Sequence, residues 1–225
     1  EHMDPGYSLY PEHTKDTAYG FLTRGCCNNC SFCIVSKKEG ICSHKVADLS
    51  EFWQGQKNIK LLDPNLLACK EHMDLLQQLV DSKSKVDFTQ GLDARFINED
   101  NITLLKQINI SMLHFAFDFM RFEKQITRGL ALAKEHLKIS DRKAIVYILT
   151  NYDTTIQEDL YRVQKVRELG FAPDIRIYRK ETLPRPHILR DLQRWSNNRF
   201  LYRSCDFKDY VPRRDGKTIK ELYYL

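Results

Sequence analysis

Three cysteines on one short stretch are the residues whose types and spacing most clearly predict chemistry in this 225-residue chain. Cys26, Cys30 and Cys33 are spaced C-x3-C-x2-C. Three thiolates from one loop can hold three irons of a [4Fe–4S] cube, which leaves the fourth iron open to a non-protein ligand. An open iron beside a bound small molecule is a place for chemistry, so the spacing predicts a reactive metal centre.

A zinc site is the alternative for the same stretch. Cys27-x2-Cys30 together with Cys42-x-His44 could supply four tetrahedral ligands to Zn²⁺, and Cys30-x2-Cys33 could form half of another such site. On this hypothesis the protein is a non-catalytic, zinc-stabilised module that binds nucleic acid. The strands and helices predicted after the loop favour the reactive centre, because a small zinc site does not need them.

The remaining cysteines have no spacing that gives them a role. Cys27 is interpreted as a bystander within the loop, and Cys42, Cys69 and Cys205 are isolated. The last three could join an auxiliary cluster, but ordinary thiols are the simpler interpretation. With seven cysteines and no secretory signal, metal ligation in a reducing cytoplasm is favoured over a disulfide framework.

Bulk composition is that of a soluble globular protein, with 42% hydrophobic and 29% charged residues. No uninterrupted apolar run approaches the roughly 18–20 residues that a membrane-spanning helix needs, so no membrane partner is expected. Residues 1–3 resemble the remnant of a cloning tag, and residues 1–16 as a whole are predicted to form an irregular N-terminal arm.

Positive charge is concentrated near the C-terminus. The chain carries a net charge of +5, and from Arg176 to Leu225 Lys and Arg outnumber Asp and Glu by thirteen to six. Such a surplus could favour an anionic partner such as nucleic acid, but a solvated, helix-rich surface is the simpler explanation. Residues 181–225 are predicted to form a basic helical extension packed on the main domain.

Short apolar runs alternate with helical patterns along residues 17–180, which predicts an α/β fold with parallel strands. A first helix is expected at Val46–Trp53 and a last one at residues 186–199. Six such units can curl into a partial (βα)6 TIM-like barrel, although periodicity does not distinguish a barrel from an open sheet. The expected strands are residues 18–23, 59–62, 86–89, 112–117, 144–149 and 174–178.

Polar residues follow the ends of these predicted strands, which is where ligands bind in both parallel architectures. They are the cysteine loop, Asp63 to Asn65, Gln90 to Arg95, Asp118, and Asn151 to Asp153.

Together these features resemble the radical S-adenosylmethionine (radical SAM) superfamily over residues 17–180. The resemblance rests on the C-x3-C-x2-C spacing after the first strand, on the order of the following units, and on the aromatic Phe32 just before the third cysteine. The segment from Arg24 to Cys33 is most similar to members that elsewhere carry a cobalamin domain or a tRNA-methylthiolating domain. The chain resembles a minimal, single-domain version of their core.

The resemblance implies an enzyme with a [4Fe–4S] cluster and S-adenosylmethionine as cofactors. In that family, reduction of the cluster cleaves S-adenosylmethionine to methionine and a 5′-deoxyadenosyl radical, which abstracts hydrogen from the substrate. It also implies an electron donor such as flavodoxin or ferredoxin. The substrate is not identified; a nucleic acid or nucleotide is our first hypothesis, a peptide or small metabolite follows, and a partner protein could present it.

Residue roles carry over unevenly from the family. Cys26, Cys30 and Cys33 match the cluster ligands. Phe32 matches the aromatic residue that lies against the adenine. The Gly-Gly-Glu that many members place after the second strand is absent, so the methionine amino group would be bound by the residues in its place, Asp63 or Asn65.

The resemblance implies further roles for residues at later strand ends. Arg95 resembles the arginine that pairs with the methionine carboxylate, a task that suits a guanidinium fork. Asp118 resembles the acidic residue that holds the ribose hydroxyls. Tyr152, Arg176 and Tyr178 are predicted walls of the adenine and substrate pocket.

Structural explanations remain open for several of these residues. Asp63 and Asn65 could form a turn, Asp93 could pair with Arg95 in a structural salt bridge, and Asp118 could cap a helix. Four phenylalanines near the fourth strand are expected to be core residues rather than pocket residues. They are Phe115, Phe117, Phe119 and Phe122.

Overall fold

A computed structural model describes residues 6–212 and 216–224 of the chain. The predicted tag remnant at residues 1–3 lies outside the described residues. The chain forms two compact units. The first comprises Glu1–Ala116 and Lys124–Ala144, and the second comprises Phe117–Glu123 and Ile145–Leu225. The division falls inside the segment that was expected to form one partial barrel.

The strands of the main sheet follow the chain in the order β1-β4-β5-β6-β7-β8. Strands β1 to β6 of this series pair in parallel within the first unit, and β7 pairs in parallel with β8 in the second. The predicted α/β fold with parallel strands is therefore confirmed, while no pairing that closes a barrel is present among the described residues. The strands are β1 (Thr17–Gly20), β4 (Asn58–Leu61), β5 (Lys85–Phe88), β6 (Asn109–Ala116), β7 (Ala144–Thr150) and β8 (Ala172–Ile177).

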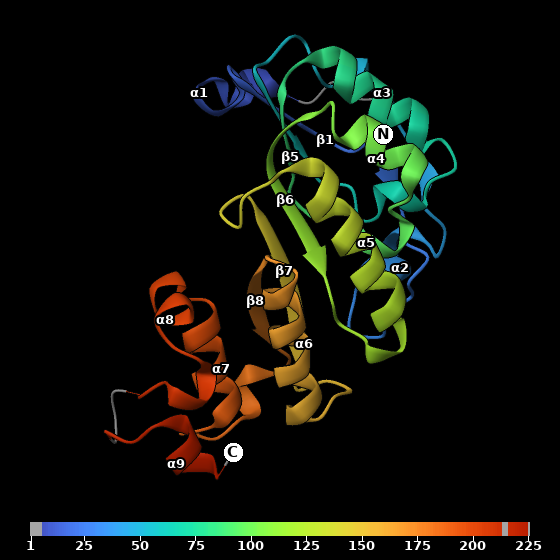
Figure 1. Ribbon diagram of the computed structural model, residues 1–225. Coiled ribbons are helices and arrows are strands. Elements are labelled where there is room, and N and C mark those ends of the chain that lie inside the picture. The colour runs from blue at the N-terminus through green and yellow to red at the C-terminus, as the bar shows by residue number, and fades with distance from the viewer. Residues whose placement is uncertain (1–5, 213–215, 225) are drawn as a thin grey trace. The chain divides into compact units, whose positions relative to one another are not determined.

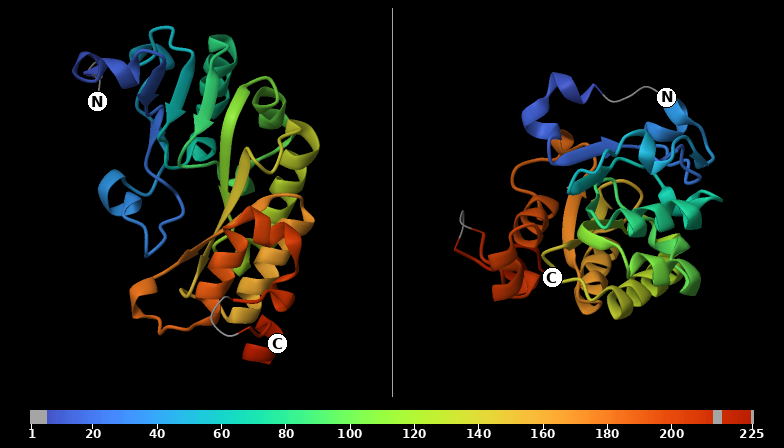
Figure 2. Two further views of the ribbon diagram at one scale, coloured as in Figure 1. Left: turned by 90° about the vertical axis from the view of Figure 1, so that its left-hand side faces the viewer. Right: turned by 90° about the horizontal axis from the view of Figure 1, so that it is seen from above.

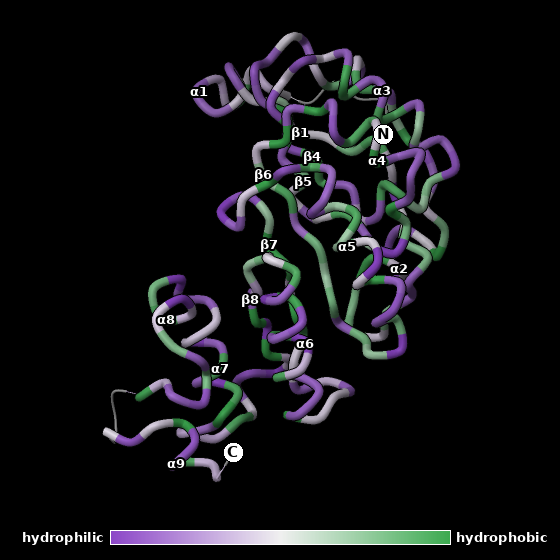
Figure 3. Tube along the Cα trace, viewed as in Figure 1, coloured by the Kyte–Doolittle hydropathy of each residue, from purple (hydrophilic) through white to green (hydrophobic). Residues whose placement is uncertain are grey.

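Helices α3 (His72–Ser82), α4 (Glu99–Leu105) and α5 (Glu123–Leu137) cover one face of the strands in the first unit (Figures 1 and 2). Because the strand order follows the chain order, right-handed crossovers place these helices on the same side. The strands carry hydrophobic stretches, whereas the helices alternate between hydrophobic and hydrophilic positions (Figure 3). Fully buried core residues include Ile59, Leu61, Leu75, Leu79, Val86, Ile102, Leu105, Leu113 and Leu130.

The segment expected to form a first helix, Val46–Trp53, is not an α-helix. Its start is held extended, because the amides of Val46 and Ala47 both donate to the Leu22 carbonyl oxygen. Only a short 3-10 turn, η2 (Leu49–Glu51), follows, with a capping box between Asp48 and Glu51. The prediction of this helix was wrong because a contact with a distant residue overrides the local pattern.

In the second unit, helix α7 (Ile188–Ser196) packs on strand β8. The Gln193 side chain donates to the Ile175 carbonyl oxygen at 2.8 Å, and Trp195 is only 2% exposed. The single helix expected over residues 186–199 is interrupted, because Asn198 caps a separate helix α8 (Arg199–Ser204). The remaining helices are α1 (Pro11–Thr14), α2 (Val35–Glu39), α6 (Ile156–Glu168) and α9 (Ile219–Tyr223).

No helix in the described part of the chain is long and apolar enough to cross a membrane.

Candidate metal and cofactor site

The cysteine loop is closed at its base by a short ribbon that the sequence did not predict. Strand β2 (Thr23–Arg24) pairs antiparallel with β3 (His44–Lys45), so the intervening residues form one loop beyond the end of β1 (Figure 2, left). Gly25 starts this loop with φ +79°, and a Cβ there would lie 2.1 Å from the Cys42 carbonyl oxygen. Only glycine permits this backbone conformation and this close approach together.

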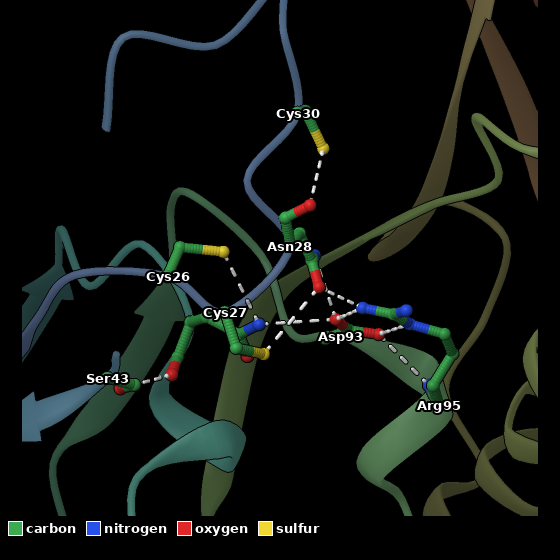
Figure 4. A network of polar contacts seen from close by, with 8 residues as sticks. Cys26, Cys27, Asn28, Cys30, Ser43, Asp93 and Arg95 are labelled. Atoms are coloured by element: carbon green, nitrogen blue, oxygen red, sulfur yellow. Dashed lines mark hydrogen bonds and ion pairs between the residues drawn. The ribbon is translucent and has the colours of Figure 1, made fainter. Parts of the chain in front are cut away.

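The three motif thiols lie on this loop and are half-buried. The Cys26 sulfur accepts a contact from the Asn65 amide at 3.6 Å, whereas the Cys30 thiol lies 3.9 Å from the Asn28 carbonyl oxygen (Figure 4). Within residues 6–212 and 216–224, no three Cys, His, Asp or Glu side chains are gathered as they would be around a metal ion. The structure thus places the thiols on one loop without gathering them.

The ligands of the zinc alternative are not brought together in the described residues either. Cys27 and Cys42 are exposed, and the His44 ring lies 3.2 Å from the Cys42 carbonyl oxygen. Of the isolated cysteines, Cys69 is buried and its thiol donates to Glu71 at 3.1 Å.

A polar network joins the cysteine loop to the ends of β4 and β5, with Asp93 at its centre (Figure 4). Arg95 forms a fork with Asp93, with Nε to Oδ1 at 2.9 Å and Nη2 to Oδ2 at 2.6 Å. The amide groups of Asn28 and Asn65 donate to Asp93 Oδ2 at 3.1 and 3.2 Å. Arg95 Nη2 also donates to Asn28 Oδ1. Three loops that are distant in sequence are thereby fixed to one carboxylate.

The charge state of Asp93 follows from these contacts. Burial raises the pKa of Asp93, but hydrogen bonds and attraction from Arg95 outweigh burial and lower that pKa overall. The Asp93–Arg95 salt bridge considered from the sequence is therefore present. Because the arginine stands at the end of a parallel strand, this salt bridge also fixes its side chain where ligands bind in such sheets.

Asn65 contains a buried acceptor that no group of the described residues satisfies. Its side chain is 1% exposed, its amide donates to Asp93 and Cys26, and its Oδ1 has no hydrogen-bond partner. Leaving such an atom unpaired costs about 1–3 kcal/mol. An acceptor next to Cys26 fits the ammonium group of an amino acid, so the residues present fit the cofactor expected from the resemblance.

Asp63, the other candidate for that ammonium, has its carboxylate engaged within the protein. Its Oδ1 accepts from the amide of Leu22 at 3.1 Å and from the amide and hydroxyl of Thr23 at 2.6 and 2.7 Å. Burial raises its pKa to about 6. These bonds connect the end of β1 to β2, and they explain why β1 ends at Gly20 rather than continuing to Thr23 as predicted.

Phe32 lies on the cysteine loop and is half-buried. Its predicted contact with adenine stays a prediction.

The other predicted site residues belong to the second unit. Asp118 accepts from the Leu149 amide at 2.9 Å. Tyr152 and Tyr178 are brought together, with ring centroids 5.0 Å apart. Arg176 pairs instead with Asp174 at 2.8 Å.

A buried arginine fixes the strand end that carries Asp118. Arg162 is fully buried beside Asp159, and it donates to the carbonyl oxygens of Phe117 at 2.7 Å and Leu149 at 2.8 Å. These bonds satisfy carbonyls at the ends of β6 and β7, so they hold Asp118 at that edge.

Sequence reasoning missed Asn28 and Ser43. Asn28 contacts both Asp93 and Arg95, and the Ser43 hydroxyl donates to the Asn65 carbonyl oxygen at 2.8 Å. Asn28 occupies a variable position of the motif, and Ser43 lies outside it, so no spacing signal pointed to either residue.

The sequence matches no protein-family model, and it has no significant match among curated proteins.

Proposed function

We propose that this protein is a radical SAM enzyme that binds a [4Fe–4S] cluster through Cys26, Cys30 and Cys33. The observation that carries the proposal is the network joining Cys26 to Asn65, Asp93 and Arg95 at the ends of parallel strands. It combines a thiol motif, a fixed cation and an unsatisfied acceptor, which are the groups that a metal-chelated amino acid requires.

Each residue of the network has a binding task in this proposal. Cys26, Cys30 and Cys33 would hold the cluster, which when bound would supply the electron for reductive cleavage of S-adenosylmethionine. Asn65 Oδ1 accepts from the ammonium group of the cofactor. Arg95 binds its carboxylate, and the ionised Asp93 keeps the guanidinium oriented. Phe32 lies against the adenine.

The remaining contacts of the proposal are those that the resemblance implies. Asp118 would hold the ribose hydroxyls, and Tyr152, Arg176 and Tyr178 would line the adenine and substrate pocket. An electron donor such as flavodoxin or ferredoxin would reduce the cluster in a cytoplasmic setting. The substrate proposed first is a nucleic acid or nucleotide, because of the basic residues near the C-terminus.

Metal content after anaerobic reconstitution with iron and sulfide tests the proposal. The wild-type chain is expected to hold about four irons, and Cys30→Ala should lose them because one thiolate ligand is missing. Cys205→Ala is the matched control, since Cys205 is a half-buried thiol outside the motif. Iron retained in Cys30→Ala would show that the ligands are misassigned.

The same measurement separates the zinc alternative. The zinc module predicts one zinc per chain that iron does not replace and that is lost in Cys27→Ala and Cys42→Ala. This result would contradict the proposal of a radical SAM enzyme.

A further inference from the structure

Four aromatic rings form a continuous row in the second unit. Phe122 lies 6.3 Å from Phe119, Phe119 lies 6.4 Å from Tyr152, and Tyr152 lies 5.0 Å from Tyr178, all between ring centroids. These residues follow the C-terminal ends of β6, β7 and β8, with the first two on the turn η5 (Met120–Phe122) or directly before it. We call these four residues the aromatic row.

The aromatic row is not part of the hydrophobic core. All four residues are half-buried, whereas neighbouring Phe117 is fully buried. The expectation that this phenylalanine cluster is core is therefore confirmed for Phe115 and Phe117 but not for Phe119 and Phe122. Contiguous rings that reach the surface of a folded protein are typical of an interaction surface.

An exposed arginine lies over the rings at each end of the row. The Arg121 guanidinium lies 4.3 Å from the Phe119 centroid and 4.9 Å from the Phe122 centroid. The Arg179 guanidinium lies 5.3 Å from the Tyr178 centroid. In the described chain neither arginine is ion-paired with a carboxylate, so both positive charges remain available to an anion.

The backbone at two strand ends adopts a conformation that non-glycine residues rarely take. Asn151 has φ +61° and Arg179 has φ +45°. The Asn151 side chain donates to the Tyr178 carbonyl oxygen at 2.8 Å, which ties the two positions together. Such conformations are unfavourable for residues with a side chain, and they cluster at functional sites.

We propose that the aromatic row, with Arg121 and Arg179, binds a single-stranded nucleic acid. Base faces stack on aromatic side chains without regard to sequence, and arginines contact the phosphates or stack on bases themselves. The second unit also contains the segment from Arg176 to Leu225, in which basic residues outnumber acidic ones by thirteen to six. An acidic protein would complement the positive charge but would not use the aromatic rings. A duplex keeps its base faces stacked inside, so they could not stack on the rings either.

That the single-stranded nucleic acid is the substrate of the enzyme rests on the proposed function. That it binds to the aromatic row does not. All residues of the surface belong to the second unit, and the motif cysteines belong to the first. A variant that cannot assemble the cluster therefore retains the surface.

Fluorescence anisotropy with labelled oligonucleotides of about 12 nucleotides, a length within known single-strand sites, tests the binding. The full-length chain is titrated into single-stranded RNA, single-stranded DNA and a duplex of the same sequence. Both single strands are expected to bind more tightly than the duplex, with an affinity that falls as salt rises. A preference between the two single strands identifies which sugar the surface favours.

Three variants locate the contacts. Phe119→Leu and Phe122→Leu keep an apolar side chain but remove a ring, and each should weaken binding roughly 5-fold or more. Arg121→Gln should reduce the slope of affinity against salt by about one charge. Matched controls are Phe200→Leu, a ring that is 88% exposed outside the row, and Lys106→Gln, an exposed cation of the first unit.

Equal binding of duplex and single strand, equal loss in the controls, or competition by polyglutamate as effective as by RNA would overturn the proposal. Circular dichroism of each variant identifies loss of folding, and Arg121→Lys, which keeps the charge, should restore the salt slope. Binding by Cys30→Ala supports the surface even if wild type assembles no cluster. If the wild-type chain carries its cluster but does not bind the single-stranded oligonucleotides, the proposed surface is rejected, whereas the proposed function is unaffected.

Discussion

Asp93 accepts hydrogen bonds from side chains on three segments of the chain. Asn28 reaches it from the cysteine loop, Asn65 from the end of β4, and Arg95 from its own turn. Because the Asp93 carboxylate is ionised, each of these hydrogen bonds is roughly twice as strong as one between neutral groups. One carboxylate therefore fixes the relative positions of the groups that the proposed function uses.

Replacing Arg95 should weaken cofactor binding without affecting the cluster. Arg95→Ala is expected to reduce S-adenosylmethionine affinity by about 1.5–3 kcal/mol, the range for hydrogen bonds to charged groups. Arg95→Lys should recover little of this affinity, because a lysine cannot form the fork with Asp93. Anaerobic calorimetry measures the affinity, and iron content is the control. Unchanged affinity in Arg95→Ala removes this residue from the site.

Asp63 should make folding stability depend on pH. Because burial raises its pKa to about 6, the folded state holds this proton more tightly than the unfolded state, whose carboxyl has the ordinary value of 3.8. The contribution of Asp63 to the free energy of unfolding therefore grows as the pH falls below 6, and it is lost as the pH rises above 6. Between about pH 7 and about pH 5 the gain is roughly 1–2 kcal/mol.

Urea unfolding at the two pH values measures the effect of Asp63. The wild-type chain should gain free energy of unfolding relative to Asp63→Asn on acidification, since the variant has no carboxyl to protonate. Asp81→Asn, at an exposed position, is the control and should follow wild type. A pH dependence in Asp63→Asn as steep as in wild type would be the contrary result.

At the scale of elements, α5 positions the turn that carries Arg95. Gly129 of α5 packs so closely on the backbone of η4 (Ala94–Phe96) that a Cβ would lie 1.8 Å from the Ala94 carbonyl oxygen. Gly→Ala inside a helix ordinarily stabilises by about 1 kcal/mol. Here the contact meets rigid backbone, so the helix and the turn would have to separate.

Gly129→Ala should therefore destabilise the protein and weaken cofactor binding. The expected sign is the reverse of the usual helix effect, with a loss of about 1–3 kcal/mol from overpacking. Thermal unfolding and calorimetric affinity measure the two effects. Arg128→Ala, at an exposed position of the same helix, serves as control. A raised melting temperature in Gly129→Ala would contradict the packing argument.

The closure of the cysteine loop depends on Gly25 in the same manner. Gly25 and Gly40 both have positive φ, at +79° and +94°, but nothing lies within 4 Å of a Cβ at Gly40. Both alanine variants incur the conformational cost, whereas only Gly25→Ala clashes with the Cys42 backbone. Iron content after reconstitution should fall in Gly25→Ala and stay close to wild type in Gly40→Ala. Equal iron in the two variants would show that the clash does not matter for the loop.

At the scale of the whole molecule, local sequence patterns predicted the strands but not their long-range links. The runs around Ile59, Val86 and Ile148 are buried strands as expected, because apolar periodicity reports burial directly. The end of β1 was predicted incorrectly because Asp63, forty-one positions away, takes the Leu22 amide. No local pattern encodes such a bond.

The candidate site was predictable to a similar extent. The strand ends and the resemblance predicted Asp63 or Asn65, together with Arg95, as candidate site residues, and the structure joins Asn65 and Arg95 to the cysteine loop through Asp93. Asn28 was not predictable, because its role depends on how the loop folds over Arg95. The division into two units also leaves no signal in strand and helix periodicity.

Reductive cleavage of S-adenosylmethionine tests the central claim most directly. The reconstituted wild-type chain is incubated anaerobically with dithionite and S-adenosylmethionine, and 5′-deoxyadenosine is quantified by chromatography. The proposed function predicts 5′-deoxyadenosine from wild type and Cys205→Ala, and none above background from Cys30→Ala. Absence of this product from a wild-type chain that carries its full iron content would contradict the account.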